Sequence, residues 1–197
     1  MRNNCLCKGV LAVAMLCVAP GALPASATAS QPGAGTLKSR KGAFALEASN
    51  LLQQVESDAI GVGKNADRLR VRLRASFEND AQSDADLLGR AQDRVNEMDK
   101  LLSRLRANES EALPWQQRAI ERIVPTVVNL TDTTEAAIAT LNNNRGRIQF
   151  SNLDGLARDM YNQATVIGQA IRNFEKYASA HHEAQRLPQT LGLKSNS

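Results

Sequence analysis

Two adjacent histidines, His181 and His182, are the side chains with the clearest capacity for metal or acid–base chemistry, and the chain contains no other histidine. Neighbouring residues on a helix point about 100° apart, so the two imidazoles cannot easily bind one metal ion without a further ligand. No Glu-x-x-His pattern of a di-metal helical site accompanies them. We therefore expect no metal site here, and we expect the pair to lie at a solvated helix end.

Haem and hydrolytic chemistry have little support either. Covalent haem needs a Cys-x-x-Cys-His motif, which the sequence lacks, and non-covalent haem needs axial ligands that face each other. Met98 and Met160 fall within apolar patterns typical of core positions, and no partner for His181 is evident. The carboxylates occupy positions expected on exposed helical faces. The sequence thus predicts no cofactor and no enzymatic activity, with a haem or metal redox protein as the least favoured alternative.

The first 27 residues have the pattern of a secretory signal peptide. Arg2 and Lys8 give a positive start, residues 10–19 form a short apolar stretch, and Ala25-Ser26-Ala27 matches a small-x-small cleavage site. The apolar stretch is shorter than the roughly 20 residues that a membrane-spanning helix needs. We therefore expect cleavage near Ala27 and an exported protein, periplasmic or secreted, with no transmembrane segment in its mature chain.

Removal of this segment changes both the cysteine count and the charge. All cysteines lie within residues 1–27 (Cys5, Cys7 and Cys17), so the mature chain has no thiol and no disulfide. The chain has 24 basic and 20 acidic residues, and two of the basic ones leave with the signal, so the remaining net charge is about +2. This small excess of positive charge predicts no nucleic-acid partner.

Four segments then carry apolar residues at alternating steps of three and four. This 3.5-residue spacing keeps one apolar seam on one helical face, as left-handed bundle packing requires. The seams are Ala48, Leu52, Val55, Ala59, Val62, Ala66, Leu69 and Leu73; Leu88, Ala91, Val95, Met98, Leu102 and Leu105; Ile120, Ile123, Val127, Leu130, Thr134, Ala137 and Leu141; and Leu153, Ala157, Met160, Ala164, Ile167, Ile171, Phe174 and Ala178.

Boundary signals divide the chain into helices near 42–77, 84–107, 114–143 and 152–183. Ser83 and Ser151 each precede an acidic residue by three positions, as in a helix capping box, and Pro114 suits a first helical turn. The alternating Arg-Leu-Arg pattern of residues 68–74 has a strand-like period of two, but its leucines continue the first seam, so we expect helix there.

The short connections favour antiparallel neighbours. We predict an all-α fold: an antiparallel up-down-up-down four-helix bundle with coiled-coil-like heptad seams. The domain plan is a signal peptide (1–27), a flexible leader (28–41), the bundle (42–185) and a flexible C-terminal tail (186–197). Glycines and a proline near the middle of three helices indicate close helix approach or a small mid-bundle cavity.

Aromatic residues make up only 4% of the chain, and this topology should gather most of them at the ends of the bundle. One end would hold a candidate ligand or partner site, formed by Phe44, Trp115, Phe174, Tyr177, His181 and His182. Phe77 and Phe150 would meet at the opposite end. The alternative is that these rings only fill the ends of the hydrophobic core and form no binding site.

The function we expect is that of an exported binding or interaction module for an unknown protein or a small apolar ligand. The alternative is a structural bundle that associates with itself as a homo-oligomer.

Overall fold

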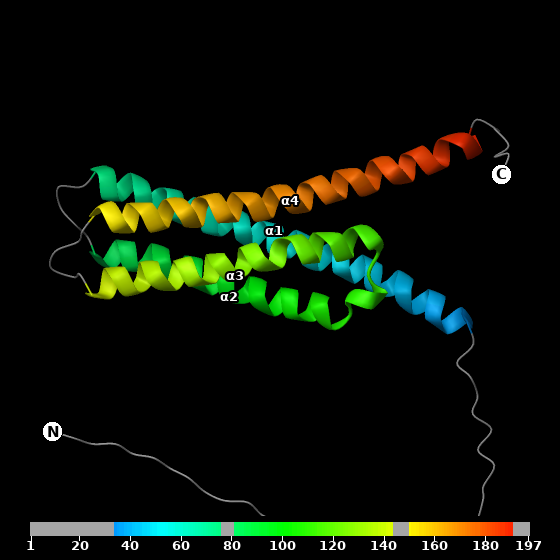
Figure 1. The fold of residues 1–197 in the computed structure, drawn as a ribbon, viewed down its shortest axis with the longest axis horizontal. Coiled ribbons are helices and arrows are strands. Elements are labelled where there is room, and N and C mark those ends of the chain that lie inside the picture. Colours follow the sequence, from blue (N-terminus) through cyan, green and yellow to red (C-terminus); the bar gives the residue numbers. More distant parts are fainter. Residues whose placement is uncertain (1–33, 76–80, 144–149, 191–197) are drawn as a thin grey trace, which may run out of the picture. The chain divides into compact units, whose positions relative to one another are not determined.

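A computed structural model describes residues 34–75, 81–143 and 150–190, with side chains placed for all of these except 34–41, 150, 151, 188 and 189. The described residues form four long helices and one short 3-10 helix: α1 (Ala34–Ala75), α2 (Ala81–Ala107), η1 (Glu109–Glu111), α3 (Pro114–Asn143) and α4 (Phe150–Thr190). Each long helix packs against the next, and α4 returns to pack on α1. The fold is therefore the predicted all-α up-down-up-down four-helix bundle (Figure 1).

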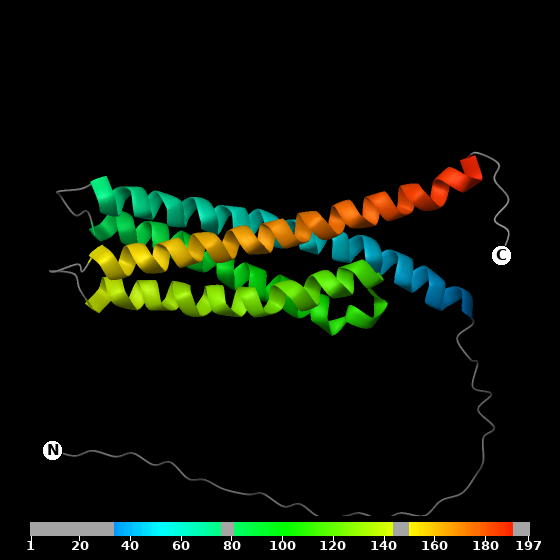
Figure 2. The same ribbon diagram turned by 45° about the horizontal axis from the view of Figure 1, so that its top comes forward.

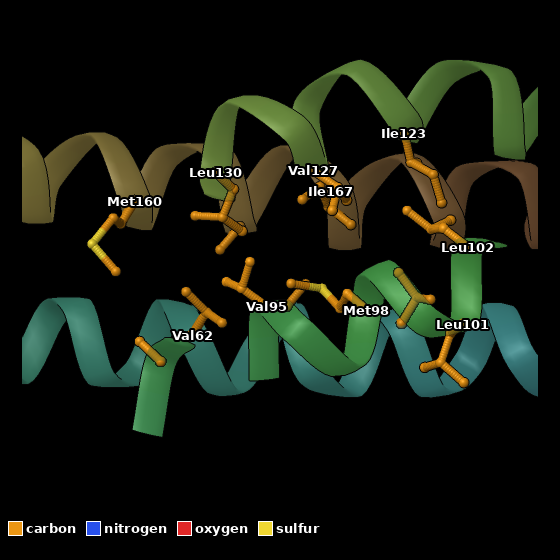
Figure 3. Packing of buried hydrophobic residues seen from close by; sticks show 14 of the residues in the cluster. Val62, Val95, Met98, Leu101, Leu102, Ile123, Val127, Leu130, Met160 and Ile167 are labelled. Carbon is orange, nitrogen blue, oxygen red and sulfur yellow. The ribbon is translucent and has the colours of Figure 1, made fainter. Parts of the chain in front are cut away.

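The four apolar seams form the core of this bundle. Every side chain of the four predicted seams is buried except Phe174 and Ala178, which are half-buried near the end of the fourth seam. In the middle of the bundle, residues from all four helices point toward one another, among them Val62, Met98, Leu130 and Ile167 (Figure 3). The 3.5-residue period accounts for this, because it keeps each seam facing the other helices along its length.

Three predicted helix ends are confirmed: α2 ends at Ala107, and α3 begins at Pro114 and ends at Asn143. The predicted caps are wrong, however. Ser83 lies inside α2, which begins at Ala81, and Ser151 lies inside α4, which begins at Phe150. Polar residues are also common in the first turn of a helix, so a Ser-x-x-acid pattern locates a helix start only to within a turn.

The outer helices are longer than the sequence predicts. The first helix starts at Ala34, within the segment expected to be a leader, and α4 continues to Thr190, beyond the expected end near residue 183. Both extensions are rich in Ala, Leu, Gln, Lys and Arg, which favour helix even where packing does not require it. Both views show the start of α1 and the end of α4 running past η1 and diverging (Figures 1 and 2).

The α1 helix is joined to both of its neighbours by ion pairs. The guanidinium of Arg94 in α2 donates to Asp58 at 2.9 Å, and that of Arg172 in α4 donates to Glu56 at 2.7 Å. Four more pairs involve α1: Arg104–Glu47, Arg72–Asp84, Arg74–Asp154 and Arg70–Asp154. The arginines of residues 68–74 therefore lie on a helix, as predicted, where three of them form ion pairs with carboxylates of α2 and α4.

Two carboxyl groups at the α1/α4 interface have perturbed pKa values. Burial, together with the nearby Glu56 carboxylate, raises the pKa of Glu175 above its ordinary range, against the effect of a hydrogen bond from Gln53. At the other end of the interface, the hydrogen bond from Arg74 lowers the pKa of Asp154. Glu175 is thus destabilised as an anion, whereas Asp154 is stabilised as one.

The expected close approach near the middle of the bundle occurs between α1 and α4. A Cβ atom placed on Gly63 would lie 3.7 Å from the Ala164 Cβ, which is ordinary van der Waals contact. Gly63 and Gly168 also line a small cavity of about 220 Å³ between these helices. In α3, the helix continues through Pro125 to Asn143.

Some sequence-based predictions concern parts of the chain outside the described residues. These are the signal peptide of residues 1–27, the position of Phe77 and the side chain of Phe150. Within the described helices, none combines the length and apolar character that a membrane span requires.

Candidate ligand-binding groove

The start of α3 is held in place by Gln116, a fully buried glutamine. Its side-chain oxygen accepts a hydrogen bond from the Leu113 backbone N–H (2.8 Å), the contact that the third helical residue makes in a capping box. Its Nε2 donates to the Ala45 carbonyl (2.7 Å) and to the Ser49 hydroxyl (2.9 Å), both on α1. This residue thus fixes the α3 terminus against α1, and with it the position of the neighbouring Trp115.

Gln117 fixes the connection that precedes α3. The Gln117 side chain donates to the carbonyls of Glu109 (2.9 Å) and Ala112 (3.2 Å), which belong to η1 and the residues after it. Trp115 therefore sits on a helix start that is tied down on both sides, and its ring is half-buried against the core.

Five of the six aromatic and histidine residues proposed from the sequence lie along the surface between α3 and α4. They line two adjoining cavities near the end of the bundle at which α3 begins, and the cavities share Trp115, Arg118 and Tyr177. Phe44 lies apart from this site, because it is only 7% exposed within the core and lines neither cavity. We refer to the residues lining these two cavities as the α3/α4 groove.

The inner cavity of the groove has a volume of about 500 Å³. Trp115 of α3 and Phe174 and Tyr177 of α4 supply aromatic surface, and Val166 and Ala170 supply aliphatic surface. The volume is in the range of about 300–1,000 Å³ typical of small-molecule sites, and its apolar walls are typical too. The inner cavity is therefore large enough and apolar enough to hold a small organic molecule.

The outer cavity, of about 590 Å³, continues toward the end of α4. It contains the histidine pair and Leu113, together with a tilted contact between the Tyr177 and His181 rings whose centroids are 6.0 Å apart. Both histidines are exposed, as expected, but they do not lie at a helix end, because α4 continues past them to Thr190. No set of three His, Cys, Asp or Glu side chains close enough to bind a metal ion occurs in the described part of the chain.

Two arginines, Arg118 and Arg122, give the groove its charge. They lie one turn apart on α3, and among the described residues neither forms an ion pair with a carboxylate. The described residues that line the two cavities include no aspartate or glutamate. The groove is thus a mainly apolar surface with uncompensated positive charge along its α3 side.

The sequence-based site lacked these arginines and also Val166 and Ala170. A signal for the α4 residues was present, because Val166, Ala170 and Tyr177 follow helical spacing on a stripe beside the core seam. Such a second apolar stripe on a helix that already has a core seam indicates a further contact surface. The arginines carried no comparable signal, since an unpaired arginine and an ion-paired one look the same in a sequence.

Comparisons of the chain with models of protein families, with known proteins and with solved structures give no match.

Proposed function

We propose that this protein is an exported, non-enzymatic binding module whose α3/α4 groove takes up an apolar ligand or an apolar segment of a partner. The observation that carries the proposal is the groove itself: aromatic and aliphatic side chains from two helices line adjoining cavities of about 500 and 590 Å³. Three of the lining side chains stay well exposed to solvent: Val166 at 47%, Leu113 at 45% and Tyr177 at 56%. Contiguous exposed apolar surface of this kind typically marks a contact site.

The local structure supports binding without a large rearrangement. The Trp115 side of the groove is anchored by the hydrogen bonds of Gln116 and Gln117, and the α4 side follows a continuous helix that packs on the core up to Phe174. A pre-formed apolar site loses less conformational freedom when its ligand binds, which favours affinity.

The neutral fluorescent probe N-phenyl-1-naphthylamine tests this function. We expect saturable binding of one molecule per chain, with quenching of Trp115 emission by energy transfer, since Trp115 is the sole tryptophan. Ala170→Gln should weaken binding, because it replaces a small lining residue of the inner cavity by a larger polar one.

Ala85→Gln is the matched control. Ala85 is also half-buried against the core, but it lies on α2 and lines neither cavity. Equal effects of the two substitutions, or no saturable binding at all, would argue against the groove as a binding site.

Export is the second part of the proposal, and it is supported by the charge and apolar pattern of residues 1–27. We expect protein recovered from outside the cytoplasm to begin at Thr28 and to be unaffected by reducing agents. N-terminal sequencing that finds Met1 on the exported form would contradict this.

A further inference from the structure

We propose that the natural ligand of the α3/α4 groove is a small aromatic anion, with its ring against Trp115 and Tyr177 and its anionic group beside Arg118 and Arg122. This inference rests on the proposed function and makes it specific. It assigns a chemical class of ligand and a role to two arginines.

The α3/α4 groove carries an imbalance of charge. Arg118 and Arg122 occupy positions i and i+4 of one helix, where like charges repel each other. The ion pairs that join helices in the described part of the chain all involve α1, so these two guanidiniums are not compensated by α4. A bound anion would remove this repulsion and accept charge-assisted hydrogen bonds from the two guanidinium groups.

Another cavity of the same bundle has a balanced charge. The cavity between α1 and α2 is lined by three arginines (Arg68, Arg72 and Arg90), but also by Asp67 and Asp86. In addition, Arg72 forms an ion pair with Asp84. Its positive charge is balanced locally, and an anion would meet carboxylates there. The α3/α4 groove combines arginines with a lining that has no carboxylate among the described residues.

The walls of the inner cavity suit an aromatic ring as the apolar part of the ligand. Trp115, Phe174 and Tyr177 line one cavity together with the small side chain of Ala170. Aromatic side chains favour offset or edge-to-face contact with a flat ring, and a guanidinium plane can stack on such a ring. Gln169 and Asn173 along the α4 edge add amide N–H donors that suit an anion.

Two probes with the same ring skeleton test the charge preference directly. The compound 8-anilinonaphthalene-1-sulfonate differs from N-phenyl-1-naphthylamine by one sulfonate group. We expect the sulfonate to bind about tenfold more tightly than the neutral probe at low salt, and we expect added NaCl to reduce this difference.

The double variant Arg118→Gln/Arg122→Gln should lower the affinity for the sulfonate far more than the affinity for the neutral probe, so that the two affinities become about equal. Arg90→Gln is the matched control, because it removes an exposed arginine of α2 that lines the balanced cavity. It should alter neither affinity.

The outcomes separate this inference from the proposed function. Equal affinities of the wild-type protein for the two probes would overturn the anion preference while the groove remained a binding site. No binding of either probe would overturn both proposals. A dimer in sedimentation velocity that Ala170→Gln dissociates would also overturn the inference, because it would assign the groove to a second copy of the chain.

Discussion

Replacing Gln116 by leucine should destabilise the bundle far more than the same replacement of its neighbour, Gln117. Leucine is similar in size to glutamine but removes three hydrogen bonds, those with the Leu113 N–H, the Ala45 carbonyl and the Ser49 hydroxyl. At a net value of about 1 kcal/mol for each bond, with a small gain from burial of the new methyl groups, the expected loss is about 2–3 kcal/mol. In a protein of this size that corresponds to a fall in Tm of about 5–10 °C.

The assay is thermal and urea unfolding followed by circular dichroism at 222 nm. Gln117→Leu is the control: this side chain is half-buried, and water can replace its bonds to carbonyls of the surface connection, so we expect a loss under about 1 kcal/mol. A double-mutant cycle with Ser49→Ala should give a positive coupling between Ser49 and Gln116. Equal losses for the two leucine variants would refute the role of Gln116 as the anchor of α3.

Three further variants test the core and the α1/α4 interface by thermal unfolding. Leu130→Asp places a charge at a fully buried core position and should lower the free energy of unfolding by about 4 kcal/mol. An unchanged Tm would mean that the third seam is misassigned. Because the pKa of Glu175 is raised by burial and by Glu56, its ionisation opposes folding as the pH rises above the ordinary value of 4.5, so Glu175→Gln should raise Tm slightly at pH 7 and lose this advantage below that value. Arg74 lowers the pKa of Asp154, so the stability from this pair is present above pH 3.8 and is lost as the pH falls through the lower folded-state pKa. Asp154→Asn should therefore lower the free energy of unfolding at pH 7 by less than about 1 kcal/mol and have no effect near about pH 2.

The bundle could be predicted from the sequence because the burial of one apolar face per helix decides its architecture. In each seam, such as the one containing Val127 and Leu130, the spacing of the apolar residues places them on one helical face, and this face is the buried one. The extra length of α1 and α4 could not be predicted in the same way, since the described side chains of residues 179–187 are all exposed and no seam marks them. Helix continues there through local propensity, which is a weaker signal than packing.

The candidate site was only partly predictable, for two physical reasons. Topology alone brings the start of α3 to the end of α4, which places Trp115 beside Tyr177, but rotation of each helix decides which rings face outward. Phe44 therefore lies in the core rather than in the groove. Gln116 was not recognised, because a buried glutamine is distinguished from an exposed one only by its three-dimensional partners.

The central claim is that the groove beside Trp115 is a ligand site, and the indole N–H signal of this residue tests it most directly. Since the chain contains one tryptophan, a ¹⁵N-labelled sample gives a single indole cross-peak in a ¹H–¹⁵N correlation spectrum. Titration with 8-anilinonaphthalene-1-sulfonate should move this peak through ring-current shifts until one equivalent is bound. Ala170→Gln should need more probe for the same movement, whereas Ala85→Gln should behave as the wild-type protein does. An indole peak that stays fixed at saturating probe, or that needs the same amount of probe in both variants, would contradict the claim.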